Sequence, residues 1–407
     1  MNRTRRAGHP AVRRDALPVL AVAAGLFAAA LGMLAGAIGV AAARMARKVV
    51  TPTRREVDTE ILALDVSAQT ITLSRTADTS LPGRYGLFTT GSAPYLKLGT
   101  VLEETETSVK RKLLTHITHD AQLNAAASFS GWYFDRPEQL QLPFTPELIG
   151  SSIGPCPAWL FPAAEDCGDW VIQVHGRGTT RAEALRAVPL FRDLGYTSLL
   201  VSYRNDGEAP RSRAGTYTLG ATEWRDVDAA LAFARRHGAR RIVLMGWSMG
   251  GAIALQVALN SSHRDLIAGI VLDSPVIDWG VVLRYQGSLL RVPRTVVGVA
   301  LGALGSPWGA SVAGTGERIP FERLDIVARA AELAHPILIL HSDDDGFVPS
   351  DASHDLVVAR PDLVEMEIFA NARHTKLWNY DQTRWSGAIT RWMRAKGLDG
   401  AHAAADS

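Results

Sequence analysis

From about Pro155 to Lys396, short runs of Val, Ile and Leu alternate with stretches of helical periodicity, and this alternation constrains the fold of the 407-residue chain most strongly. The apolar runs include "WVIQV", "SLLV", "RIVLM", "LIAGIVL" and "PILIL". Between two of them, Val227, Leu231 and Ala234 recur at the spacing of one helix face. Strands that are apolar throughout are buried on both faces. The pattern therefore predicts an α/β fold with a mostly parallel, doubly wound sheet.

The segment "GWSMGG" at residues 246–251 joins the apolar run "RIVLM" to the helical stretch "AIALQVAL". A G-x-S-x-G pattern arises by chance in about one chain of five of this composition, so its context decides its meaning. A strand before it and a helix after it fit a strained turn, in which glycines allow close packing around an exposed serine. We therefore predict that Ser248 is a nucleophile. The N–H of Met249, which follows it, is the predicted first donor to an oxyanion.

A serine hydroxyl needs a base to remove its proton, and the predicted base is His374. This residue stands in "NARHTKLWN", a polar loop between the last apolar run, "VEMEIF", and the last helical stretch. A second oxyanion donor is predicted in the glycine loop "HGRG" at 175–178, from the N–H of Arg177 or of a neighbour one residue away.

The predicted acid is Asp345, which would orient the imidazole of the histidine and stabilise its charged form. It ends the triple acid of "HSDDDGFVP", directly after an apolar run. Asp343 and Asp344 in the same loop are alternatives, with a solvated or turn-forming role as their ordinary explanation. Asp273 in "VLDSP" also ends a strand and is a third alternative.

The segments "VHGRG", "GWSMGG", "HSDDDGFVP" and "ARHTKLWN" occur in the order of the α/β-hydrolase superfamily, which the chain resembles from about Pro155 to Lys396. The resemblance is closest to prolyl-oligopeptidase-type and small membrane-tethered serine hydrolases, and "SYRND" followed by "TEWRDVDAAL" adds to it. It implies a Ser-His-Asp acyl hydrolase without a metal or organic cofactor. The roles then fall on Ser248, Asp345, His374, Met249 and Arg177. No β-propeller precedes the hydrolase region, which disfavours an oligopeptidase.

Residues 16–43 contain no charged side chain, and basic residues flank them on both sides. A run of this length can cross a bilayer with tilt, so we predict a transmembrane anchor at 16–43. A cleaved signal peptide and a buried soluble helix are the alternatives. Five Arg precede the run and five Lys or Arg follow it closely, so charge barely sets the orientation. We expect the catalytic domain on the extracytoplasmic side.

The remaining domain boundaries are predicted from changes in composition and in the spacing of apolar residues along the chain. We predict a basic segment at 1–15, a charged linker at 44–58, a small β-rich region at 59–145, a catalytic domain at 146–396 and a flexible tail at 397–407. Within the catalytic domain, residues 280–334 interrupt the alternation with apolar, glycine-rich sequence. An insertion directly after a strand end predicts a lid over the binding site, with a packed helical excursion as the alternative.

The net charge of +2 and the absence of a basic stripe argue against nucleic-acid binding. His116 and His119 lie three residues apart without a third ligand nearby, which argues against a metal site. Cys156 and Cys167 could form a disulfide or stay reduced. The predicted function is membrane-anchored hydrolysis of carboxylic esters, with lipid esters or thioesters as candidate substrates. A peptidase or amidase of the same fold, or a catalytically silent binding protein, is the alternative.

Overall fold

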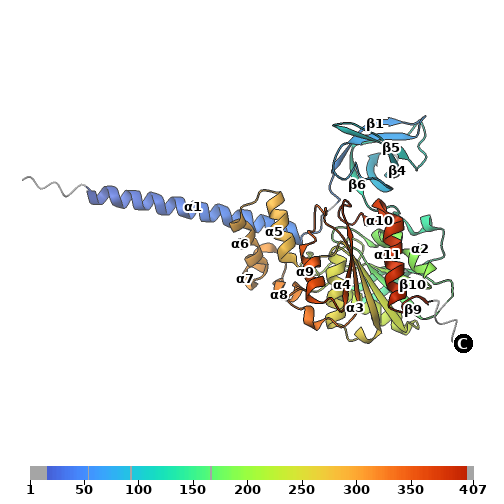
Figure 1. Ribbon diagram of the computed structural model, residues 1–407. Helices are drawn as coiled ribbons and strands as arrows, with labels where there is room; N and C mark the ends of the chain where they lie inside the picture. Colours follow the sequence, from blue (N-terminus) through green and yellow to red (C-terminus); the bar gives the residue numbers. More distant parts are fainter. Residues whose placement is uncertain (1–15, 54, 92–93, 166, 401–407) are drawn as a thin grey trace, which may run out of the picture.

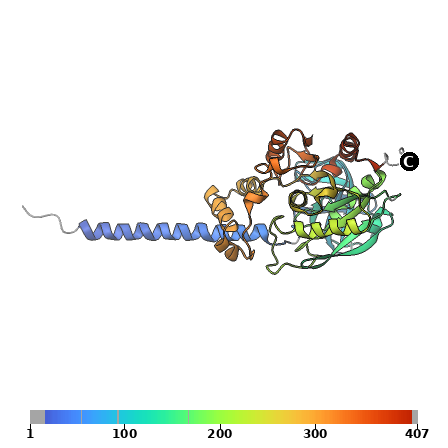
Figure 2. The ribbon, with the colours of Figure 1, turned by 90° about the horizontal axis from the view of Figure 1, so that it is seen from below.

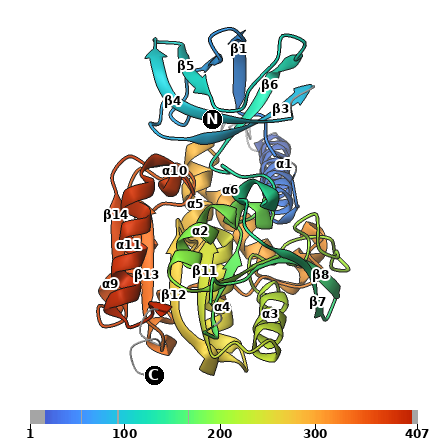
Figure 3. The ribbon, with the colours of Figure 1, turned by 90° about the vertical axis from the view of Figure 1, so that its right-hand side faces the viewer.

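The computed structural model describes residues 16–53, 55–91, 94–165 and 167–400, and it consists of three parts: a long helix, a small barrel and a large sheet with its helices (Figure 1). The predicted basic segment 1–15 and residues 401–407 of the predicted tail lie outside the described residues. Viewed from the side in Figure 3, the barrel stands above the sheet domain, and α1 runs beside the contact between them.

The N-terminal helix α1 is a single element of 35 residues, Ala16–Val50. The prediction that a linker begins at residue 44 was therefore wrong, because the helix continues for seven more residues. Ala42, Ala46 and Val50 recur every four residues and are buried against the rest of the protein. Arg44, Arg47 and Lys48 lie on the exposed face. The same turns of the helix therefore bury their apolar side chains against the protein and keep their charged side chains in contact with solvent.

Among the described helices, α1 is long and apolar enough by itself to cross a membrane, over Val22–Val50. Every residue from Val22 to Ala37 is exposed, and packing against the protein begins at Ile38. An apolar helix of this kind near the N-terminus is typical of an anchor or of a signal sequence.

A closed barrel of six strands follows α1, in the order β1-β2-β5-β4-β3-β6. The strands are β1 Thr59–Asp65, β2 Thr70–Ser74, β3 Tyr85–Gly91, β4 Tyr95–Glu104, β5 Ser108–Leu113 and β6 Leu123–Ser130. Arg111 is buried in the barrel, and its guanidinium donates to the carbonyl oxygens of Thr79, Leu81, Gly83 and Gly99 at 2.8–3.1 Å. The barrel lies within the predicted β-rich region 59–145. Its strand β6 contains a run of three alanines, which have low β propensity, so the sequence of β6 carries no strand signal of its own.

The large sheet has eight strands in the order β14-β13-β12-β11-β9-β10-β8-β7. Its strands are β7 Thr145–Ser151, β8 Gly154–Phe161, β9 Asp169–Val174, β10 Thr197–Val201, β11 Arg241–Trp247, β12 Ile267–Asp273, β13 Ile337–Ser342 and β14 Val364–Phe369. Strands β9 to β14 pair in parallel with one another. Strand β8 pairs in antiparallel fashion with both of its neighbours, β10 and β7. The predicted mostly parallel sheet is confirmed.

Helices cover both faces of this sheet, which confirms the doubly wound arrangement. The covering helices are α2 Val188–Asp193, α3 Trp224–Arg236, α4 Met249–Asn260, α9 Asp351–Ala359, α10 Leu377–Tyr380 and α11 Gln382–Ala395, with short 3₁₀ turns at Pro137–Leu140, Arg181–Ala187, Arg264–Leu266 and Ala330–Glu332. Along β11, Ile242 and Leu244 pack with α3 and α4, whereas Val243 and Met245 pack with α2 and α11. The apolar strands are therefore explained by burial on both sides.

Between β12 and β13, four helices leave the sheet, and two of them, α6 and α7, pack against the end of α1, as Figure 2 shows from below. They are α5 Trp279–Leu289, α6 Arg294–Leu304, α7 Pro307–Ala313 and α8 Phe321–Leu324. Helices α6 and α7 bend by 105° at their junction, where Pro307 occupies the first turn of α7. This insertion occupies the predicted region 280–334.

Cys156 and Cys167 are both free thiols. Cys156 lies in β8, and the Sγ atom of Cys167 is 3.3 Å from the carbonyl oxygen of Gly195. The structure thus contains the reduced alternative of the two that the sequence left open.

Candidate active site

Ser248 lies at the tight turn between β11 and α4, with φ 53° and ψ −117°. This is a strained conformation for a residue with a side chain. The glycines around it are sterically required. A Cβ atom on Gly246 would lie 2.4 Å from the carbonyl oxygen of Gly250, and one on Gly250 would lie 2.1 Å from that of Val174. The close approach of strand, turn and helix therefore holds the hydroxyl of Ser248 out at the strand end.

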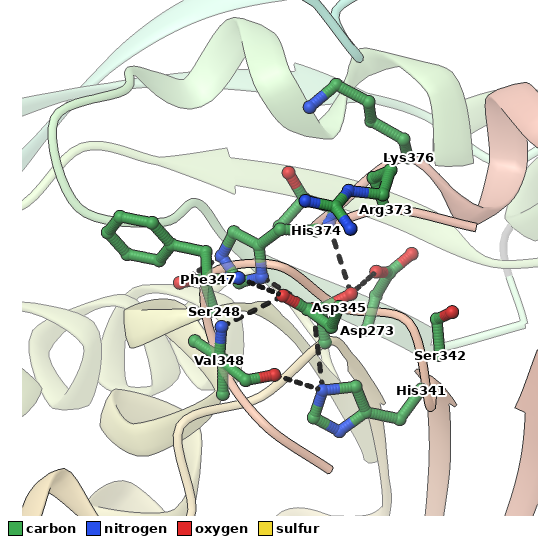
Figure 4. Close-up of polar contacts among 12 residues, drawn as sticks. Ser248, Asp273, His341, Ser342, Asp345, Phe347, Val348, Arg373, His374 and Lys376 are labelled. Atoms are coloured by element: carbon green, nitrogen blue, oxygen red, sulfur yellow. Dashed lines mark hydrogen bonds and ion pairs between the residues drawn. The ribbon is translucent and has the colours of Figure 1, made fainter. Parts of the chain in front are cut away.

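The three side chains predicted as nucleophile, base and acid lie in hydrogen-bond contact (Figure 4). The Oγ atom of Ser248 is 2.9 Å from Nε2 of His374, and Nδ1 of His374 is 2.8 Å from Oδ2 of Asp345. An ionised carboxylate only accepts hydrogen bonds, so Nδ1 carries the proton and donates to Asp345. Nε2 is then free to accept the hydroxyl proton of Ser248.

The carboxyl of Asp345 is buried and remains ionised. Burial alone would raise its pKa, but electrostatic attraction to, and hydrogen bonds from, the imidazoles of His374 and His341 outweigh that effect and hold the pKa well below its usual range. Its other oxygen, Oδ1, accepts from the N–H groups of Phe347 and Val348, both at 2.9 Å. These contacts fix the carboxylate toward the imidazole.

The alternative acids have other partners. Asp343 contacts His354 and Ser350, both at 2.8–2.9 Å. Asp344 contacts Arg373 on the exposed side of the loop.

Asp273 is fully buried at the end of β12, and burial raises the pKa of its carboxyl. Its oxygens accept from Trp385 Nε1 at 2.8 Å and from the hydroxyl of Ser274 at 3.0 Å. The structure thus gives the histidine contact to Asp345 and places Asp273 in a packing role.

The loop from His175 to Thr179 lies against the serine, since a Cβ on Gly176 would be 3.2 Å from that of Ser248. The N–H of Gly176 donates to Glu183 Oε2 at 2.7 Å, whereas within the described residues no acceptor is recorded for the N–H of Arg177. The N–H of Met249, at the first position of α4, has no acceptor within its own helix. The two predicted oxyanion donors therefore flank the serine, and Glu183 was not anticipated as the support of their loop.

The side chain of Arg177 serves a separate purpose. Its Nη2 atom donates to the carbonyl oxygens of Lys48 and Thr51, at 2.9 and 3.2 Å. The carbonyl of Lys48 belongs to the last turn of α1, which leaves it without a partner in the helix, and Thr51 directly follows the helix. The predicted oxyanion loop is thereby tied to α1.

Two further groups hold the histidine loop, and neither was evident from the sequence. Arg186, which is fully buried, donates to the carbonyl oxygens of Thr375 and Gly131 at 2.8 and 2.9 Å. Asp78 of the barrel pairs with Lys376 at 3.1 Å and with Arg373 at 3.3 Å, so it contacts both flanks of His374. Such contacts join segments far apart in the chain, and no local pattern signals them.

A cavity of about 360 Å³ opens in front of Ser248 and His374. Its apolar walls come from α5, including Trp279, Val282 and Leu283, and from the last turns of α1. The sequence predicted α1 only as an anchor. Its small residues four apart, Ala42 and Ala46, are a signal of close helix packing that could have indicated this contact.

No group of His, Cys, Asp and Glu side chains able to hold a metal ion is found among the residues that the structure describes. His116 and His119 lie in a loop after β5.

Comparison with known proteins supports the fold and the family. A model of the alpha/beta hydrolase family matches residues 171–385, more than half of the chain. A model of a domain of unknown function (DUF8805) matches residues 60–130, which form the barrel. No curated protein matches significantly.

Among solved structures, an esterase from Pyrococcus furiosus is similar with a TM-score of 0.51 and 17% identity, over 64% of this chain and 93% of that one. A second crystal form of the same esterase gives a TM-score of 0.50 and 16% identity, over 64% and 95% of the two chains. A puromycin-hydrolyzing peptidase from Mycobacterium tuberculosis gives 0.45 and 18%, over 81% of this chain and 45% of that chain. At these identities the likeness concerns the fold.

Proposed function

Because the chain belongs to the alpha/beta hydrolase family, we propose that it is a membrane-anchored serine hydrolase that cleaves carboxylic esters through an acyl-enzyme. Hydrolase activity follows from the family, whereas the bond type, the three residue roles and the anchoring are the proposal. We also propose that α1 keeps the catalytic domain at the extracytoplasmic face of a membrane.

The observation that carries the proposal is the continuous line of hydrogen bonds from Asp345 through His374 to Ser248, at 2.8 and 2.9 Å. Each member has what its role requires. Ser248 is held in a strained turn, His374 has Nε2 directed at the hydroxyl, and Asp345 is ionised and anchored by two backbone N–H groups. Three groups so arranged activate a serine hydroxyl that is a weak nucleophile alone.

The proposed reaction has two halves. In the first, His374 Nε2 takes the hydroxyl proton while Ser248 Oγ bonds to the ester carbonyl carbon, and the resulting oxyanion accepts from the N–H groups of Met249 and Arg177. The carbon–oxygen bond to the leaving alcohol then breaks, and His374 returns the proton to that oxygen. In the second half, water repeats the attack on the acyl-Ser248, which releases the carboxylic acid and restores the serine. Losing one oxyanion donor costs about 3 kcal/mol of transition-state stabilisation in such sites.

An ester is the proposed substrate because α5 forms an apolar wall beside Ser248, with Trp279, Val282 and Leu283, although the charged side chains of Lys48 and Glu56 also line the cavity. Apolar walls favour an acyl group with little hydrogen-bonding capacity over a peptide, whose amides would be left without partners. Thioesters of similar acyl groups satisfy the same requirement.

A fluorophosphonate probe tests the serine directly on the full-length protein in detergent. We expect labelling of the wild type and none of Ser248→Ala, because the probe bonds only to an activated serine. Ser261→Ala is the matched control, since Ser261 is a buried serine that contacts Asp228 and lies outside the cavity. Equal labelling of wild type and Ser248→Ala would contradict the proposal. Faster hydrolysis of peptide amides than of esters would replace the esterase with an amidase.

A further inference from the structure

Helix α1 forms one wall of the cavity that contains the proposed nucleophile. Met45, Lys48 and Val49, from the last turns of α1, line the same cavity as Ser248 and His374. The carbonyls that end the helix are held by Arg177, whose N–H is a proposed oxyanion donor. The element that would cross the membrane thus also contributes to the substrate site.

We propose that this cavity is an acyl-binding site completed by α1, and that its substrate is an ester whose apolar chain enters from the bilayer between α1 and α5. The inference rests on the proposed esterase function and specifies its substrate class. The acyl chain would lie between Val49 of α1 and Val282 and Leu283 of α5, with its carbonyl carbon at Ser248. Contact with alkyl side chains favours an apolar chain through removal of its surface from water.

The length of α1 indicates where the membrane lies. Its part from Ala16 to Ala37 comprises 22 residues, which at about 1.5 Å per residue extend about 33 Å, close to the hydrocarbon thickness of a bilayer. The described side chains of this part are exposed, and contact with the inserted helices begins at Ile38. The hydrocarbon boundary therefore falls near residue 38. Lys48 at the cavity is ten residues farther along, about 15 Å beyond it.

The inserted helices carry a surface suited to that position. No charged residue occurs from Thr295 to Gly316, and Val299, Trp308 and Val312 are 43–67% exposed there. Helices α6 and α7 pack on α1, so this apolar surface lies beside the span rather than on a remote face (Figure 2). Exposed tryptophan is typical of the membrane–water interface. Basic side chains follow on both sides of the segment, at Arg294 and Arg318, where lipid headgroups would lie.

The mouth of the cavity continues this arrangement. Leu290, 64% exposed, lines the cavity at the end of α5, opposite Lys48 of α1. An acyl chain that leaves the bilayer along α1 would meet the apolar side chains of Leu290, Leu283 and Val282, while the charged pair of Lys48 and Glu56 also lines the cavity.

The test uses the full-length protein in vesicles of phosphatidylethanolamine and phosphatidylglycerol, with p-nitrophenyl palmitate and p-nitrophenyl butyrate as probes. The measured quantity is the ratio of kcat/KM for palmitate over butyrate. In Val49→Trp, a larger side chain fills the cavity, and we expect this ratio to fall by about tenfold or more, since single methylenes in such pockets are worth that factor. Val40→Trp is the matched control, because Val40 is exposed on α1 and outside the cavity. It should keep the wild-type ratio.

A second variant guards against misfolding of the first. Met45→Ala enlarges the same wall with a good helix former, and we expect the ratio to shift toward palmitate. An unchanged ratio in both variants, or a wild-type preference for butyrate, would overturn the inference. Absence of Ser248-dependent hydrolysis of either ester would instead overturn the proposed function.

The route is tested by placing palmitate ester and protein in the same or in separate vesicles. Entry from the bilayer predicts rapid hydrolysis only when they share a vesicle, since the ester must otherwise transfer through water. Equal rates in the two arrangements would mean that the chain arrives from water, and would contradict the route.

Discussion

The two oxygens of Asp345 have separate tasks. Oδ2 accepts from His374, whereas Oδ1 is held by the N–H groups of Phe347 and Val348. Gln286 of α5 donates to the carbonyl oxygen of Phe347 at 2.5 Å, so the inserted helices also brace this loop. A carboxylate fixed in this way sets both the orientation and the tautomer of the imidazole.

Replacing Asp345 with Asn should therefore leave the protein folded but nearly inactive. An amide nitrogen facing Nδ1 would favour the tautomer that carries its proton on Nε2, which cannot accept from Ser248. We expect kcat to fall by about 10³–10⁴-fold, as in other triads that lose the carboxylate charge. The control is Asp273→Asn, which should lower the melting temperature because Asp273 is buried. It should change kcat by less than about tenfold, which corresponds to less than about 1.4 kcal/mol in the activation free energy. A larger loss of kcat in Asp273→Asn would assign the acid to that residue.

The lowered pKa of Asp345 has a consequence for stability. The folded protein holds this carboxyl ionised more strongly than the unfolded chain, whose Asp pKa is about 3.9. The contribution to the free energy of unfolding is thus complete above that pKa and is lost as the pH falls toward the lower folded pKa. We expect the stability difference between wild type and Asp345→Asn to be constant above about pH 5 and to shrink below about pH 4. Urea unfolding across this range measures it, and a difference that grows on acidification would contradict the sign.

The residues proposed to react were predictable from the sequence because each follows an apolar strand in a short polar or glycine-rich loop. Strand ends of a parallel sheet meet at one edge, so order along the chain predicts proximity. Glu183, Arg186 and Asp78 were not predictable, because a charged residue in a helical stretch or surface turn is ordinarily solvated. Their partners lie up to 298 residues away, at separations that no local pattern encodes.

At the level of elements, the turn from β11 to α4 requires glycine at positions where a side chain would clash with the neighbouring backbone. Gly250→Ala would place a Cβ 2.1 Å from the carbonyl oxygen of Val174, so strand, turn and helix would have to separate. We expect a loss of about 1–3 kcal/mol or more in stability, the range for overpacking a core. The matched control is Gly298→Ala in α6, where a Cβ would have no atom within 4 Å. Alanine has a higher helix propensity than glycine, so this variant should be as stable as the wild type or more stable by up to about 1 kcal/mol. Equal melting temperatures for the two variants would contradict this steric account.

The elements that the sequence missed or misplaced have physical reasons. Strand β6 contains Ala125, Ala126 and Ala127 and has no apolar alternation, so barrel closure rather than propensity determines it. Helix α1 extends to Val50 because its last turns bury Ala42, Ala46 and Val50 against the catalytic domain. The strands of the large sheet that are buried on both faces were predictable, because such strands are apolar throughout and can be identified from their own composition.

At the level of the whole molecule, the barrel contacts the catalytic domain at the loop that carries His374. Asp78 lies next to Arg373 and Lys376, and the carbonyl oxygen of Arg84 accepts from Asn379 at 2.8 Å. The barrel therefore supports the position of the proposed base rather than hanging free on a linker.

Asp78→Asn should loosen that loop without unfolding the protein. Because the pair is partly exposed, its contribution is modest, about 0.5–1 kcal/mol, and we expect a two- to fivefold fall in kcat with little change in KM. Glu106→Gln, in an exposed turn of the same barrel, is the control and should retain wild-type kcat. Equal kcat values for the two variants would show that the barrel does not support the site.

The central claim is that Ser248 becomes acylated during turnover. Mixing the full-length protein with excess p-nitrophenyl butyrate, quenching in acid within milliseconds and mapping the peptides by mass spectrometry measures this directly. We predict a butyryl group on the peptide containing Ser248 and none at that peptide in Ser248→Ala, which should also lose the burst of p-nitrophenol. Ester hydrolysis at the wild-type rate by Ser248→Ala, or an acyl group at another residue in the wild type, would contradict the account.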